Sequence, residues 1–123
     1  MKKQVLIYNF DSEELSRAKR ALLPLHFSVR EVTKEEALIP VGYIAGAVED
    51  GTPDTGEYEF SGKLVVIAGF VGADLDRLLA AMRKAGFGRD VLKAMLTPSN
   101  CRWSGARLYS EIYREHMQMK GRG

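Results

Sequence analysis

The sequence has little cysteine, little histidine and no long hydrophobic run. Its single cysteine, Cys101, excludes an internal disulfide, and no Cys/His cluster has the spacing of a structural zinc site. No apolar run approaches the roughly 20 residues that span a bilayer, and the apolar part of residues 1–10 is too short for a signal peptide. We therefore expect a cytoplasmic protein in a reducing compartment, without a bound metal, a cofactor or membrane contact.

The composition that is present is that of one ordinary globular domain. The chain has 123 residues, of which 46% are hydrophobic and 28% charged, so residues 1–123 are long enough to close one core. Charge is uneven along the chain: residues 1–30 carry six basic and three acidic side chains, residues 31–76 two and ten, and residues 77–123 ten and three. Acidic and basic faces that meet within the fold or across an oligomer, or phosphate or nucleic-acid binding by the C-terminal part, are the two interpretations.

The first half of the chain predicts a strand, a helix and a second strand. "QVLIYNF" from Gln4 predicts a strand, and residues 11–23 predict a helix with one apolar face. Asp11 and Glu14 have the spacing of a capping box, and Pro24 ends the helix. "FSVREV", residues 27–32, predicts a half-exposed strand.

The middle of the chain lacks a hydrophobic period. Within "LIPVGYIAGA", residues 38–47, we expect a short helix packed by Tyr43 and Ile44. Residues 48–62 then predict a flexible acidic excursion, because Gly, Pro and Asp stand at turn positions. The excursion lacks the D-x-D-x-D-G order of a calcium loop, so we interpret its carboxylates as solvated: Glu49, Asp50, Asp54, Glu57 and Glu59.

The second half repeats the plan of the first. It predicts a continuous apolar strand from Lys63, a helix over residues 73–86 that Gly86 ends, a fourth strand from Val91, and a last helix from Ser104. This order predicts an α+β fold, a ferredoxin-like split β-α-β sandwich (β-α-β-β-α-β) with an added C-terminal helix. The first and third strands are apolar throughout and should be central, so the last helix or a second protomer should cover the sheet face opposite the two helices. An α/β doubly wound parallel sheet is the alternative.

The polar stretch "LTPSNCRWSG", residues 96–105, has two interpretations. In the structural one, Thr97–Asn100 form a turn, Ser104 caps the last helix, and Trp103 packs on Leu108 as a hydrophobic staple. In the functional one, hydroxyls, an amide and cations gather around an anion at the helix start. The ligand-binding candidates are Lys93, Thr97, Ser99, Asn100, Arg102 and Trp103.

The stretch "LKAMLTPSNCRW", followed by a helix that contains "REHM", resembles a small bacterial family known only as a domain of unknown function. The resembling signature is K-A-x-L-T-P-x-N-x-x-W, and it covers, with "GF" at Gly69 and Phe70 and the helix after it, roughly the last 60 residues. The resemblance implies no activity. It directs attention to Lys93, Thr97, Pro98, Asn100 and Trp103.

Enzymatic and RNA-binding interpretations have little support. Cys101 would need a histidine partner, and His116 falls on the apolar face of the last helix with Leu108, Tyr109, Ile112 and Met119, which predicts a packed histidine. "VLIYNF" resembles the first-strand motif of RNA-recognition domains, but "KLVVIAGF" offers no aromatic residue before Phe70.

Two functional hypotheses follow from the sequence. The favoured one is a non-enzymatic protein-interaction or regulatory binding module, a homodimer through the sheet or the last helix, or a module with a protein partner. The alternative is a small anion- or nucleotide-binding protein or enzyme that uses the 97–103 loop. Nucleic-acid binding through the basic C-terminal region is a lesser alternative.

Overall fold

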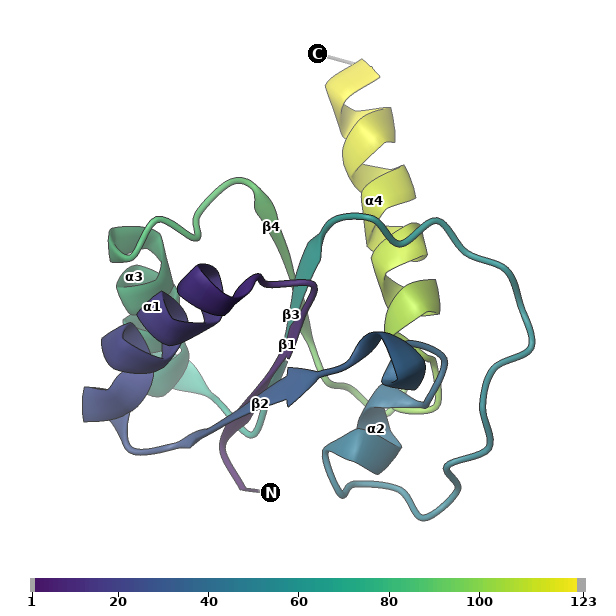
Figure 1. Cartoon of the computed structure of the whole chain (residues 1–123), viewed down its shortest axis with the longest axis horizontal. Helices are drawn as coiled ribbons and strands as arrows, with labels where there is room; N and C mark the ends of the chain where they lie inside the picture. The colour runs from purple at the N-terminus through teal and green to yellow at the C-terminus, as the bar shows by residue number, and fades with distance from the viewer. Residues whose placement is uncertain (1, 122–123) are drawn as a thin grey trace.

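The computed structural model describes residues 2–121, with side chains described as far as Gln118. Figure 1 shows a sheet with α1 and α3 on one face and α2, α4 and a long connection on the other. The elements are, in chain order, β1 (Gln4–Tyr8), α1 (Ser12–Leu22), η1 (Leu23–Leu25), β2 (Ser28–Val32), η2 (Lys34–Glu36), α2 (Val41–Ile44), β3 (Lys63–Ala68), α3 (Gly72–Lys84), β4 (Val91–Met95) and α4 (Gly105–Gly121), where η denotes a 3₁₀ helix.

The sheet is mixed, and its strand order is β2-β1-β3-β4. β1 pairs in parallel with β2 and antiparallel with β3, and β3 pairs in parallel with β4. The predicted ferredoxin-like order is therefore wrong, because each edge strand lies beside the central strand of its own β-α-β unit. The parallel alternative is wrong as well, because the central pair is antiparallel. Both predicted central strands and both predicted edges are confirmed, and those positions are the same in the ferredoxin-like order, so strand composition did not distinguish the two.

The two β-α-β units are related by a pseudo-two-fold axis perpendicular to the sheet, with an offset of 60 residues. Leu6 pairs with Val66 on this axis. The offset relates Phe10 to Phe70 and Phe27 to Phe87, and the aromatic contacts follow it, since Phe10 packs on Phe87 at 5.0 Å between ring centroids and Phe27 on Phe70 at 4.9 Å. The second half therefore repeats the first in packing as well as in plan.

The face under α1 and α3 is closed by these two helices alone. The strands contribute buried valine and isoleucine, α1 contributes Ala18 and Leu22, and α3 contributes Leu78 and Met82. Both helix ends match the sequence: the capping box of Asp11 and Glu14 is present, and Gly86 follows α3 with φ of +94°. Only glycine adopts that conformation without strain.

The opposite face is closed by segments that are distant in the sequence. Leu108 and Tyr109 of α4 and Val41 of α2 are buried against it, and Phe60 packs between Tyr8 and Tyr109. The last helix thus covers this face, as expected. The short helix α2 is present, but it buries Val41, whereas Tyr43 is exposed.

None of the described helices combines the length and the apolar character that crossing a membrane requires.

Candidate functional site

The turn at residues 97–103 is organised by its own side chains. The Asn100 carboxamide accepts a hydrogen bond from the Thr97 amide at 2.9 Å and donates one to the Met95 carbonyl at 3.0 Å. The Thr97 hydroxyl accepts from the Asn100 amide at 3.2 Å. The same two side chains that were candidates for ligand binding therefore hold the turn together, as Asn and Thr side chains do in Asx and ST turns.

The turn is also fixed from outside by α2. The Gly42 amide donates to the Cys101 carbonyl at 2.8 Å, and the Val41 amide donates to the Trp103 carbonyl at 2.9 Å. A Cβ atom at residue 42 would lie 2.5 Å from the Cys101 carbonyl oxygen, so only glycine permits this approach. The sequence pattern did not reveal this contact, because it joins segments about 60 residues apart.

Ser104 connects α4 to the acidic connection. It is completely buried, its hydroxyl accepts from the Arg107 amide at 3.1 Å, and it donates to an Asp54 carboxylate oxygen at 3.1 Å. The predicted N-cap is confirmed. Asp54 also accepts from the Gly56 amide at 2.9 Å, which, ahead of smaller contributions, lowers the pKa of that carboxyl. Asp54 thus fixes the acidic connection over the start of α4.

Lys93 does not lie at the turn. Its strand partner is Val65, so its side chain points to the α1/α3 face, and its ammonium donates to the carbonyls of Gly88 at 2.6 Å and Val91 at 3.2 Å. Those carbonyls precede or begin β4, whereas Thr97 follows the end of β4. Burial, and then the nearby Arg83 guanidinium, lower the pKa of Lys93. The candidate residues therefore form two separate groups.

The other candidates lie on the surface near the turn. Ser99 and Arg102 are exposed, and Trp103 is half-buried at the edge of the core that contains Leu108. The Arg107 guanidinium lies over the Trp103 ring at 4.1 Å from its centroid. Trp103 thus has both an apolar and a cation–π contact of its own.

The structure separates Cys101 from both histidines in role. The Cys101 thiol donates to the Pro98 carbonyl at 3.5 Å. His116 is exposed, so the prediction of a packed histidine is wrong, because α4 runs beyond the sheet after Ile112; Met119, on the same predicted face, lies outside the described side chains. Among residues 2–118, no group of three His, Cys, Asp or Glu side chains has the arrangement of a metal site.

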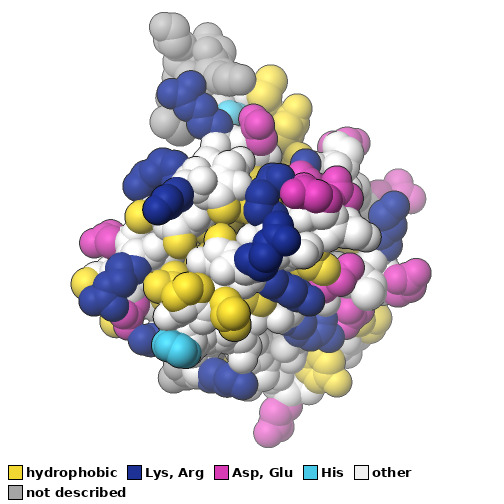
Figure 2. Space-filling model, turned by 60° about the vertical axis from the view of Figure 1, so that its left-hand side comes forward, with side chains coloured by type: hydrophobic (Ala, Val, Ile, Leu, Met, Phe, Trp, Pro, Cys, Tyr) yellow, Lys and Arg dark blue, Asp and Glu magenta, His cyan; other side chains and the backbone are white. Residues whose placement is uncertain are grey.

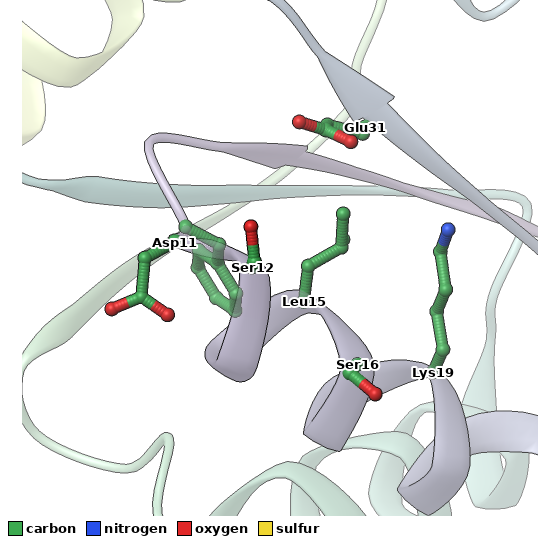
Figure 3. A pocket seen from close by; sticks show the side chains of 7 residues that line it. Asp11, Ser12, Leu15, Ser16, Lys19 and Glu31 are labelled. Atoms are coloured by element: carbon green, nitrogen blue, oxygen red, sulfur yellow. The ribbon is translucent and has the colours of Figure 1, made fainter.

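The largest hollow lies between the start of α1 and the end of β2, with a volume of about 530 Å³. In Figure 3, Leu15 and Lys19 point from α1 toward the strands, and Glu31 lies across from them. The Asp11 carboxylate on its rim is occupied by the helix cap. The hollow is thus lined by mixed charges and offers a polar groove without a convergent set of catalytic groups.

A second hollow, of about 430 Å³, runs along the outer half of α4. Its lining residues are Glu59, Ser110, Tyr113, Arg114, Met117 and Gln118. Sequence reasoning passed over this surface, although Tyr109, Tyr113 and Met117 stand four residues apart and thus share one helix face. That spacing was the available signal.

A family model described as a domain of unknown function (DUF3783) matches residues 63–119, which run from β3 into α4. Comparison with curated proteins and comparison with solved structures gave no significant match. The match covers the second β-α-β unit and the helix that closes the opposite face, the same part of the chain that resembles such a family by its motif. A DUF3783 domain of unknown function is therefore found in the second half of this chain.

Proposed function

We propose that this protein is a non-enzymatic interaction module that associates with a second copy of itself through the outer half of α4. The observation that carries the proposal is the course of that helix. Its first turns bury Leu108 and Tyr109 against the sheet, and its later turns extend past the sheet, as Figure 1 shows.

The extended part of α4 keeps an apolar stripe. Tyr113 is 41% exposed and Met117 47% exposed, and the Tyr113 ring stacks on Tyr109 with centroids 5.8 Å apart. The stripe is therefore continuous with the core. An apolar helix face that continues outside its own domain is typical of a surface that another helix or domain covers.

Charge favours a second copy as the occupant. Glu59 and Arg114 border the same groove as Tyr113 and Met117. In a two-fold interface the same patch meets itself, so Glu59 of one protomer faces Arg114 of its partner, and the reverse. The only described ion pair of Arg114, with Glu111 at 3.7 Å, is exposed and weak, so this guanidinium is available to a partner.

Sedimentation velocity over a range of concentrations tests the proposal. We expect a dimer for the wild type and a monomer for the double variant Tyr113→Ser with Met117→Ser, because interface energy concentrates in a few central apolar side chains. Arg114→Glu should weaken the dimer, and adding Glu59→Arg should restore it. Val71→Ser, which removes an equally exposed apolar side chain at another place, is the matched control.

A wild type that stays monomeric at every concentration would contradict the proposal. So would a dimer that the Tyr113 and Met117 changes leave intact, because the interface would then lie elsewhere.

The alternative function, ligand binding by the 97–103 turn, draws support from the exposed Ser99 and Arg102. It has less support than the interaction module, because Thr97 and Asn100 are engaged in the turn and Lys93 points elsewhere.

A further inference from the structure

Two aliphatic side chains project from one end of the molecule, where β1 begins and β3 ends. Leu23 stands at the start of η1 and is 74% exposed, and Val71 precedes α3 and is 76% exposed. They are the most exposed large hydrophobic side chains among the described residues. Such exposure in both of two neighbouring connections asks for an explanation, because single exposed apolar residues are ordinary but adjoining ones are less so.

The base from which these side chains project is well fixed. Below them the Phe27 and Phe70 rings pack edge to face at 4.9 Å. The Leu23 carbonyl accepts from the His26 amide at 3.3 Å, and Pro24 restricts the backbone between them. A partner that binds here therefore orders little of this protein, which favours affinity.

The surface between the two side chains is positively charged. Two adjoining hollows, of about 400 and 210 Å³, share Lys3 and His26, and Lys2 and Arg77 line one each. The carboxylate that lines them is Asp74, which pairs with Lys3 and lies 3.4 Å from Arg77. Three cations thus surround one carboxylate. Figure 2 shows this side of the molecule, where Lys and Arg side chains surround patches of hydrophobic ones.

The pseudo-two-fold axis supplies an internal control. At the opposite end of the sheet, the offset of 60 residues places Asp11 at the position of Val71 and Arg83 at the position of Leu23. Asp11 caps its helix through the Glu14 amide at 2.8 Å, whereas Val71 makes no such bond to α3. The fold therefore accepts polar residues at both positions, and the aliphatic pair at this end is not required by the architecture.

We propose that this end of the molecule, defined by Leu23, Val71, Lys2, Lys3, His26 and Arg77, binds an acidic peptide segment of a partner protein. Apolar side chains of the segment pack against Leu23 and Val71, and its carboxylates meet the ammonium and guanidinium groups beside them. This surface is at a different place from the outer half of α4, so the inference does not depend on self-association.

Selection from a displayed library of random dodecapeptides tests the proposal on the full chain. We expect the selected peptides to be enriched in Asp and Glu and to contain aliphatic or aromatic residues. Against Leu23→Ser with Val71→Ser, their affinity should fall by about tenfold, the loss of roughly 1.4 kcal/mol of contact energy. Lys2→Glu should weaken them further. Tyr113→Ser with Met117→Ser, at the α4 surface, should leave the affinity unchanged.

Because both substituted side chains are largely exposed, the variants should unfold at the wild-type midpoint, which separates loss of binding from loss of fold. Selected peptides that are neutral or basic, or that bind the Leu23 and Val71 variant equally well, overturn the proposal. Sedimentation with vesicles of anionic phospholipid is the second measurement. If vesicles bind through Leu23 and Val71 while no acidic peptide is selected, the surface recognises a membrane and the peptide proposal is wrong.

Discussion

The two faces of the sheet are closed by different means. The face under α1 and α3 is covered by helices that directly follow the strands they pack on, and two equivalent phenylalanine pairs lie at its ends. The opposite face is covered by α4, α2 and the acidic connection, which are held to one another by Gly42 and Cys101 and by Asp54 and Ser104. The comparison shows why the polar turn resembled a site: its side chains are needed where three distant segments meet.

The largest expected effect compares the cores of the two faces directly. Leu78→Ala removes a buried side chain under α3, and Leu108→Ala removes one under α4. Each should lower the free energy of unfolding by about 2–5 kcal/mol, because a cavity remains in a packed core. Urea unfolding measures both. An effect of Leu108→Ala close to that of the exposed Leu23→Ala would mean that α4 packs loosely.

Gly42→Ala tests the contact between α2 and the turn. The added methyl group would meet the Cys101 carbonyl, which is part of the backbone and cannot rotate away. We expect a loss of about 1–3 kcal/mol of unfolding free energy, the usual cost of overpacking. Gly88→Ala is the control, because its Cβ would lie an ordinary 3.7 Å from Arg83. Equal stabilities for the two variants would contradict the close approach.

Asn100→Ala distinguishes a turn from a site. It removes one acceptor and one donor that hold residues 95–100 in place. We expect unfolding free energy to fall by about 1 kcal/mol, with little effect from Ser99→Ala. If Asn100→Ala leaves stability unchanged but abolishes NMR shifts caused by added phosphate in the wild type, the turn is a ligand site.

The smallest expected effect concerns pH at the edge of the second face. The Arg30 guanidinium, bonded to Glu36 at 2.7 Å, holds the pKa of that carboxyl at about 2. Because the folded pKa is below the unfolded value of about 4.3, the contribution is complete above that value and is lost as pH falls toward 2. Both side chains are partly exposed, so solvent reduces the effect.

Unfolding by urea at a series of acidic pH values measures this contribution. Glu36→Gln should show a flatter decline of stability in that range than the wild type, while the exposed neighbour Glu35→Gln should follow the wild type. Identical profiles for all three proteins would mean that the ion pair contributes nothing.

Local elements could be predicted because their signals lie within a few residues. The capping box of Asp11 and Glu14, the Gly86 helix end and the Ser104 cap are each present, and the apolar runs around Leu6 and Val66 are the central strands. The candidate site was predicted only in part. Lys93 stands four residues before Thr97, but its position in β4 directs it to the other face, and the exposure of His116 depends on where the sheet ends beneath α4.

The sequence by itself determined the strands, the helices, their ends and which strands are central, because backbone propensity, capping and hydrophobic period act over short distances. Only the tertiary structure decided the order of the strands and the use of the polar turn. Two pairings of the edge strands bury the same apolar faces, so composition cannot separate them. The contacts of Gly42 with Cys101 and of Asp54 with Ser104 join residues about 50–60 positions apart, and they exist only once the chain has closed.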